Sequence, residues 1–207
     1  SKPNKPKNDS KRILRKQIVI AVVAVVIVGL LAAGGWWQYR RIQHGRVIAL
    51  GRTLLERKDY HQAAISIGRA LQINPRDVEA TRMMIELTKA INSRQELHYR
   101  HMLVQLEPNV VANHLELAEC ALRYQLPETA EQALANVSEE GKKTAVFHEV
   151  AGHVALASKD LAEAESHFAQ AIELDPKSEQ SQLNLAFIRL QSKDEETRTE
   201  ARATIEK

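Results

Sequence analysis

Apolar and polar residues alternate along the chain with a helical period, and the clearest stretch runs from residue 156 to residue 176. After a polar turn at Lys159 and Asp160, apolar side chains recur three or four positions apart. They are Leu161, Ala164, Phe168, Ala171 and Ile172. This spacing places them on one face of an α-helix. Pro176 ends that helix, because proline has no backbone N–H to continue the hydrogen-bond ladder.

The same pattern occurs earlier in the chain, over residues 59–75. Its apolar positions and its closing proline match those of the later stretch in order: Tyr60, Ala63, Ile67, Ala70 and Pro75. The two copies are offset by 101 residues, which is close to three periods of about 34. A single helical hairpin cannot bury its own apolar face, so the period predicts an all-α solenoid of stacked hairpins.

In these residues the chain resembles the tetratricopeptide repeat, a helix–turn–helix unit of about 34 residues. The resemblance implies a solenoid over residues 44–207, with repeats at about 44–77, 78–110, 111–143 and 145–178 and a partial repeat at 179–207. Gly51 stands where the family favours a small residue for close packing of the two helices. The second repeat departs from the pattern, because Glu96 fills a position that is otherwise small.

Three local features of the expected repeats are irregular. The prolines Pro75 and Pro108 are 33 residues apart, which predicts a turn one residue short near Asn92. Residues 192–199 predict a longer charged loop, with a helix beginning near Ala201. The sequence stops within that helix, so we expect the native chain to continue.

Residues 18–37 form a run of 20 residues without a charge. A helix of that length spans about 30 Å, the thickness of the hydrocarbon core of a bilayer. We therefore expect a single transmembrane helix at 18–38, preceded by a disordered basic tail at 1–17. The residues expected at the membrane interface are aromatic or basic: Trp36, Trp37, Tyr39, Arg40 and Arg41. A cleaved signal peptide is the alternative, since small residues at 32–34 would suit a cleavage site.

The distribution of basic residues predicts how the chain is oriented. Residues 1–41 carry nine Lys and Arg against one acidic residue, and seven of the nine precede the apolar run. The positive-inside rule places the tail in the cytoplasm and the repeats across the membrane. We expect a single-pass protein of a bacterial inner membrane with periplasmic repeats. An inverted arrangement, with the repeats facing the cytosol as in a mitochondrial receptor, is the alternative.

Composition narrows the function classes further. The formal net charge of the whole chain is +3, but residues 111–207 carry ten basic residues against eighteen acidic ones. A nucleic-acid-binding protein normally has a basic globular face, so the acidic distal half argues against that class. Cys120 is the single cysteine, so no disulfide forms within the chain and we expect a buried small side chain there.

Candidate chemical motifs do not reach the spacing that they require. His148 and Glu149 begin like a zinc-protease helix, but the second histidine, His153, comes five positions after the first instead of four. The two rings then point about 140° apart around the helix. His98 and His101 are expected to be ordinary surface histidines. We expect no catalytic residue, no metal, no cofactor and no small-molecule substrate.

The resemblance also implies a binding groove along the first helix of each repeat. The residues expected to face it are Arg52, Arg82, Glu86, Lys89, Leu115, Glu119, Leu122, Arg123, Glu149, His153 and Phe187. The Lys/Asn pair with which chaperone-binding members hold a terminal carboxylate is replaced by Ile48 and Arg52. A mixture of apolar and charged residues suits an amphipathic helix or an extended segment of a partner protein.

Two functions fit these expectations. The first is a membrane-anchored scaffold or assembly factor, similar in layout to bacterial inner-membrane tetratricopeptide proteins, which contacts lipid through residues 18–38 and holds a partner in the groove. The second is a structural subunit of a membrane complex, held through its transmembrane helix. An open, exchangeable groove would distinguish the first from the second.

Overall fold

The computed structural model describes residues 27–31, 34–35, 38, 42–192 and 194–206. The predicted tail at 1–17, much of the predicted transmembrane helix and all five expected interface residues lie outside these ranges. Within the described ranges, no helix combines the length and the apolar character needed to cross a membrane.

The described chain consists of helices that follow one another in pairs. The first helix, at residues 42–56, pairs with α2 (Tyr60–Ile73), and α3 (Val78–Ala90) pairs with α4 (Gln95–Leu106). The later pairs are α5 (Val111–Arg123) with α6 (Pro127–Ala135), α7 (Ala145–Ala157) with α8 (Leu161–Leu174), and α9 (Glu179–Arg189) with α10 (Glu195–Ile205). A short 3-10 helix, η1 (Gly141–Lys143), precedes α7. We refer to the first member of each pair as an A helix and to the second as a B helix.

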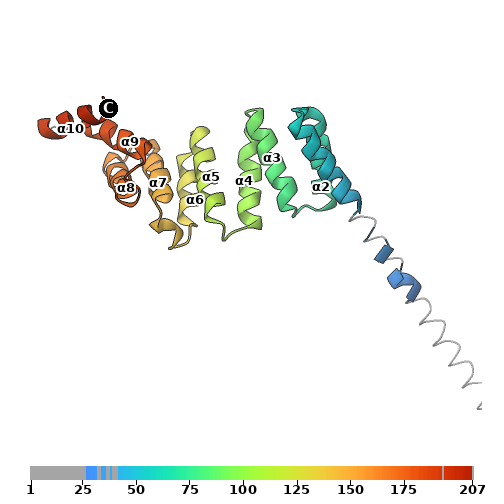
Figure 1. The fold of residues 1–207 in the computed structure, drawn as a ribbon. Coiled ribbons are helices and arrows are strands. Elements are labelled where there is room, and N and C mark those ends of the chain that lie inside the picture. Colours follow the sequence, from blue (N-terminus) through green and yellow to red (C-terminus); the bar gives the residue numbers. More distant parts are fainter. Residues whose placement is uncertain (1–26, 32–33, 36–37, 39–41, 193, 207) are drawn as a thin grey trace, which may run out of the picture.

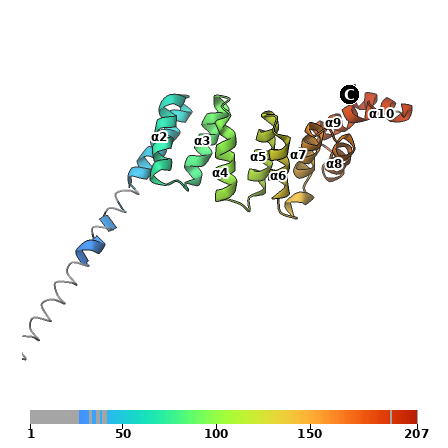
Figure 2. The same ribbon diagram turned by 180° about the vertical axis from the view of Figure 1, so that it is seen from behind.

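The pairs are stacked in one elongated row, which Figures 1 and 2 show from opposite sides. The first helix and α2 lie at one end of the row and α10 lies at the other. The direction of the helices changes along the row, so that α10 lies across the direction of α4 in both views. The predicted all-α solenoid is confirmed in the described part of the chain.

The turn between the A and B helices has the same form in the first four pairs. One residue in each turn has a positive φ, between 51° and 65°: Lys58, Asn92, Gln125 and Lys159. The next residue donates its N–H to a carbonyl five positions back, as Ser93 does to Thr88 at 2.8 Å. This closes the A helix in the manner of a Schellman motif.

The expectation of a shortened turn near Asn92 is therefore wrong. The missing residue of the second repeat lies in its B helix instead, because α4 has 12 residues where α2 and α8 have 14. A turn closed by these hydrogen bonds cannot lose a residue without losing the motif, whereas a helix can be shortened at its end.

The expected loop at residues 192–199 is also largely helical. The helix α10 begins at Glu195, and the Asp194 carboxylate accepts the Thr197 N–H at 2.8 Å and the Thr197 hydroxyl at 2.6 Å. An aspartate cap satisfies a free N–H group of the first turn. Glu195 and Glu196 in that turn are favourable beside the positive end of the helix dipole. The charged residues therefore start a helix.

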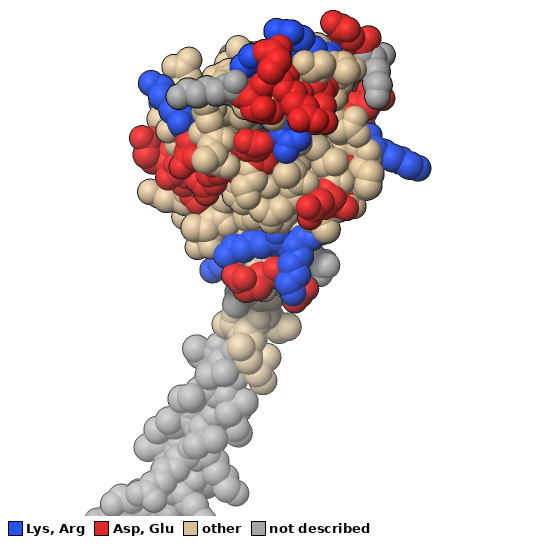
Figure 3. All heavy atoms as spheres, turned by 90° about the vertical axis from the view of Figure 1, so that its left-hand side faces the viewer, with Lys and Arg blue, Asp and Glu red and all other residues tan. Residues whose placement is uncertain are grey.

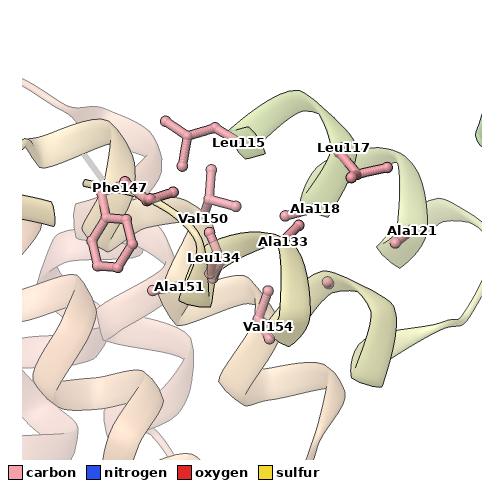
Figure 4. Close-up of a cluster of buried hydrophobic side chains, with 12 residues drawn as sticks. Leu115, Leu117, Ala118, Ala121, Ala133, Leu134, Phe147, Val150, Ala151 and Val154 are labelled. Atoms are coloured by element: carbon pink, nitrogen blue, oxygen red, sulfur yellow. The ribbon is translucent and has the colours of Figure 1, made fainter. Parts of the chain in front are cut away.

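The apolar core is divided into clusters along the row, as expected for a solenoid in which each hairpin contacts only its neighbours. One cluster joins the first two pairs, a second joins α5 and α6 to α7, and a third joins α7, α8 and α9. Figure 4 shows the second cluster, in which Phe147 and Val150 of α7 pack close to Leu115 and Leu134 of the preceding pair.

Glycine allows the A and B helices to approach closely at two equivalent positions, 101 residues apart. A Cβ atom at Gly51 would lie 2.9 Å from Ile67 Cγ1, and one at Gly152 would lie 2.8 Å from two ring carbons of Phe168. Ile67 and Phe168 are both fully buried. The prediction of close packing at Gly51 is confirmed.

Acidic side chains form several patches at the C-terminal end of the row, which faces the viewer in Figure 3. The sequence of the distal half predicts this, since acidic residues outnumber basic ones over residues 111–207. Like charges on this face repel polyanions.

Candidate interaction groove

A pocket of about 590 Å³ lies between the first helix and α3, the A helices of the first two pairs. Its floor is apolar, because Leu55 and Met83 pack there with only 7% and 5% of their surfaces exposed. The walls carry charged side chains from both helices. The lining residues are Arg52, Leu55, Glu56, Val78, Glu79, Arg82, Met83 and Glu86.

Both arginines of the pocket are paired with a carboxylate of a later element. Arg52 forms an ion pair with Glu79 of α3. Arg82 donates from Nη2 to Glu107 Oε2 at 2.5 Å, and the same oxygen accepts the Asn113 amide at 3.0 Å. The pairs link the first helix to α3 and α3 to the segment before α5. Pairs this exposed contribute about 0–1 kcal/mol each, so they orient the arginines more than they stabilise the fold.

Two carboxylates of the pocket stand apart from this pairing. Glu56 and Glu86 are both exposed, and neither has an ion-pair or hydrogen-bond partner among the described side chains. The pocket therefore combines an apolar floor with a surplus of negative charge on its walls.

Arg123, a predicted groove residue at the end of α5, belongs to a buried network between the second and third pairs. It donates from Nη2 to both oxygens of Glu96 at 2.7 Å, and Arg100 donates to Glu96 from Nε at 2.7 Å. Arg100 also donates to Glu116 at 2.7 Å. Glu96 is 2% exposed, so the residue that departed from the repeat pattern is buried and paired.

The network holds Glu96 in its charged form. Burial raises the pKa of this carboxyl, but the hydrogen bonds and charges of Arg100 and Arg123 outweigh burial and leave the pKa below its ordinary value of 4.5. Cys120 lies fully buried beside the network, as predicted. Burial raises the pKa of its thiol, and the charge of Glu96 raises it further, so the thiol stays protonated.

The other predicted groove residues differ in accessibility. Lys89, Glu119 and Phe187 are exposed, with Phe187 at 55%, whereas Leu122, Glu149 and His153 are half-buried. Leu115 is 7% exposed and packs in the core cluster of α5, α6 and α7, where no partner reaches it in this structure. The pocket brings together only Arg52, Arg82 and Glu86 of the predicted set.

Sequence reasoning missed Glu56 and Glu79 as lining residues. Both belong to A helices, and Glu79 is the ion-pair partner of Arg52. The signal that could have found Glu79 is its place one residue after the start of α3, close to the end of the groove where Arg52 lies.

The three histidines of the last pairs make contacts between helices. His148 of α7 and His167 of α8 place their Nδ1 atoms 3.0 Å apart, and His153 Nε2 lies 3.3 Å from the Asn184 amide of α9. His148 and His153 thus contact different helices, as the angle between them predicts. In the described part of the chain, no group of three or more His, Cys, Asp or Glu side chains could hold a metal ion.

Comparison with known families and structures supports the repeat assignment. Residues 147–178 match the family model of the tetratricopeptide repeat. These residues contain α7 from Phe147 onward and all of α8, with Gly152 and Phe168 at their contact. The sequence has no match among curated proteins.

Solved structures with a similar fold are those of other helical solenoids. MamA from Desulfovibrio magneticus RS-1, from residue 41 to its end, is 16% identical with a TM-score of 0.68, over 79% of this chain and 94% of that one. PilF from Pseudomonas aeruginosa is 19% identical with a TM-score of 0.61, over 81% and 75% of the two chains. YrrB, a TPR protein with an unusual peptide-binding site, is 16% identical with a TM-score of 0.63, over 76% and 82%.

These comparisons define the class of protein. The chain is an all-α solenoid with the tetratricopeptide fold, and the stretch at 147–178 is a tetratricopeptide repeat. Stacked helical repeats of this kind present an extended surface for binding other proteins.

Proposed function

We propose that this protein is a membrane-anchored scaffold or assembly factor that binds segments of partner proteins along its A helices. The observation that carries the proposal is the pocket between the first helix and α3, with Leu55 and Met83 on its floor and charged side chains on its walls. An apolar floor with a few oriented polar groups is the general character of a binding pocket. Among proteins of similar fold, YrrB has a peptide-binding site.

The proposed anchor rests on the sequence of the segment before the solenoid. Residues 18–37 carry no charge, and the aromatic and basic residues that follow are those found where a helix leaves a bilayer. Few residues separate Trp37 from the first helix, so an anchored solenoid would start close to the membrane surface. Tethering raises the effective concentration of the groove for membrane partners, and modest affinity then suffices.

Photo-crosslinking in cells tests the groove. A photoreactive residue in place of Arg82 lies in the pocket, and one in place of Glu128, which is exposed on the B helix α6, serves as the matched control. We expect several substoichiometric protein adducts from position 82 and none of them from position 128. The same adducts from both positions would contradict the groove.

The same experiment separates the scaffold from the structural subunit. A single stoichiometric adduct that persists through membrane solubilisation would show a permanently occupied groove and favour a subunit of a membrane complex.

Cysteine labelling tests the proposed anchor and its orientation in a bacterial inner membrane. The single native thiol, Cys120, is buried, so a membrane-impermeant maleimide reports on an introduced cysteine against a low background. We expect Lys177→Cys, at an exposed position after α8, to be labelled from the periplasmic side and Ser1→Cys only after lysis. Recovery of the full chain in the soluble fraction would overturn the anchor.

A further inference from the structure

The pocket between the first helix and α3 has an asymmetry of charge that bears on which partner it accepts. Its two arginines already face carboxylates, Arg52 with Glu79 and Arg82 with Glu107. Counting Glu107, the two arginines stand among five carboxylates when Glu56 and Glu86 are included. A bound segment therefore meets negative charge that no described side chain neutralises.

The two unpaired carboxylates lie beside the apolar floor. Glu56 follows Leu55 in the first helix, and Glu86 is three residues after Met83 in α3, so each helix contributes one apolar side chain and one carboxylate. Residues three apart on a helix are neighbours on its surface. Met83 adds adaptability, since an unbranched thioether side chain fills irregular space.

We propose that this pocket selects a protein segment that carries an apolar side chain flanked by lysine or arginine. The apolar side chain rests on Leu55 and Met83, and the cationic groups reach Glu56 and Glu86. The inference rests on the proposed function and specifies the chemistry of its partner.

The arrangement disfavours the opposite choice. An acidic segment, or a free terminal carboxylate, gains nothing from Arg52 or Arg82 unless it displaces Glu79 or Glu107, and it meets Glu56 and Glu86 at close range. Like charges brought together in an interface reject the wrong partner. A neutral apolar segment keeps the contact with the floor and loses only the ionic part.

Selection from a random peptide library displayed on phage tests this preference with the full 207-residue chain. The library is sorted on the wild-type protein, on Glu56→Gln/Glu86→Gln, and on the matched control Glu128→Gln/Glu173→Gln. The control removes two exposed carboxylates from the B helices α6 and α8, which likewise have no described ion-pair partner. A photoreactive residue in place of Arg82 then reports whether each selected peptide occupies the pocket.

We expect the wild type and the control to enrich peptides with a Lys or Arg within four residues of an apolar side chain. The pocket variant should bind those peptides roughly three- to tenfold more weakly, the range for two exposed ion pairs, and added salt should remove most of the difference. Peptides that crosslink at position 82 without any excess of basic residues would overturn this inference and leave the groove function standing. If no selected peptide crosslinks there, both fail.

Discussion

The Arg123 guanidinium of α5 lies 2.7 Å from both carboxylate oxygens of Glu96 on α4, and so joins the second hairpin to the third through a residue that is 2% exposed. A buried carboxylate is costly unless its lone pairs are satisfied. Here Arg100 supplies a further donor from the same helix as Glu96. The junction between the two hairpins therefore depends on charge pairing where other junctions depend on small apolar residues.

Glu96→Leu should destabilise the fold by about 3 kcal/mol, because Arg100 stays buried and loses one of its two carboxylate partners. The double variant Glu96→Leu/Arg100→Met should recover most of that loss, since neither charge then needs a partner. Thermal unfolding followed by circular dichroism measures both.

The control for this comparison is Arg189→Met, which removes an exposed ion pair with Glu165 and should cost at most about 1 kcal/mol. A double variant as unstable as the single one would show that the network contributes shape and not charge.

Gly152→Ala should destabilise the fourth hairpin by about 1–3 kcal/mol, because the new methyl group would lie 2.8 Å from the ring of Phe168. The matched control is Gly68→Ala in α2, where a Cβ atom meets nothing within 4 Å. Alanine there should be neutral or raise stability by up to about 1 kcal/mol through its helix propensity. Equal unfolding temperatures for the two variants would contradict the close contact.

Asp77→Ala should cost more than Asp160→Ala, although both residues cap a helix. Asp77 accepts the Ala80 N–H at 2.6 Å and lies 3.0 Å from His44 Nε2, whereas Asp160 accepts the Glu163 N–H at 2.9 Å and has no described ion-pair partner. Loss of a cap alone costs about 0.5–2 kcal/mol. Unfolding by urea compares the variants, and an equal loss would assign no role to the His44 contact.

Stability should fall as the pH drops below about 6.5, the ordinary pKa of histidine. Burial lowers the pKa of His148, and the charge of His167 lowers it further, so the unfolded chain takes up this proton before the folded chain does. Stability then rises with pH across the window between the two pKa values. The charged groups nearest this pair are Glu163 of α8 at 3.8 Å from His167 Nε2, and Glu131 and Lys142 in the adjoining pocket.

A pH series of unfolding temperatures tests this, with His167→Gln expected to flatten the profile between pH 5 and pH 7. The control is His101→Gln, which removes an exposed histidine of α4 and should leave the slope unchanged. A wild-type profile that is flat over this range would contradict a role for the histidine pair.

The sequence by itself determined the hairpins and their stacking. Apolar residues at helical spacing, small residues at Ala63 and Ala164, and prolines after α2 and α8 specify helices of defined length that cannot be stable alone. Pro127 begins α6, where its missing N–H costs nothing. These features are local in the chain, so the pattern of side chains suffices to predict them.

The tertiary structure alone decided which side chains of the A helices are accessible and which charges are paired. Leu115 and Phe187 were predicted alike, yet the first is 7% exposed and the second 55%, because the neighbouring hairpin covers one and not the other. Glu96 looked like a defect, since its partner Arg123 is 27 residues away in the sequence. Charge pairing and burial depend on distances between hairpins, and a repeat pattern carries no record of those distances.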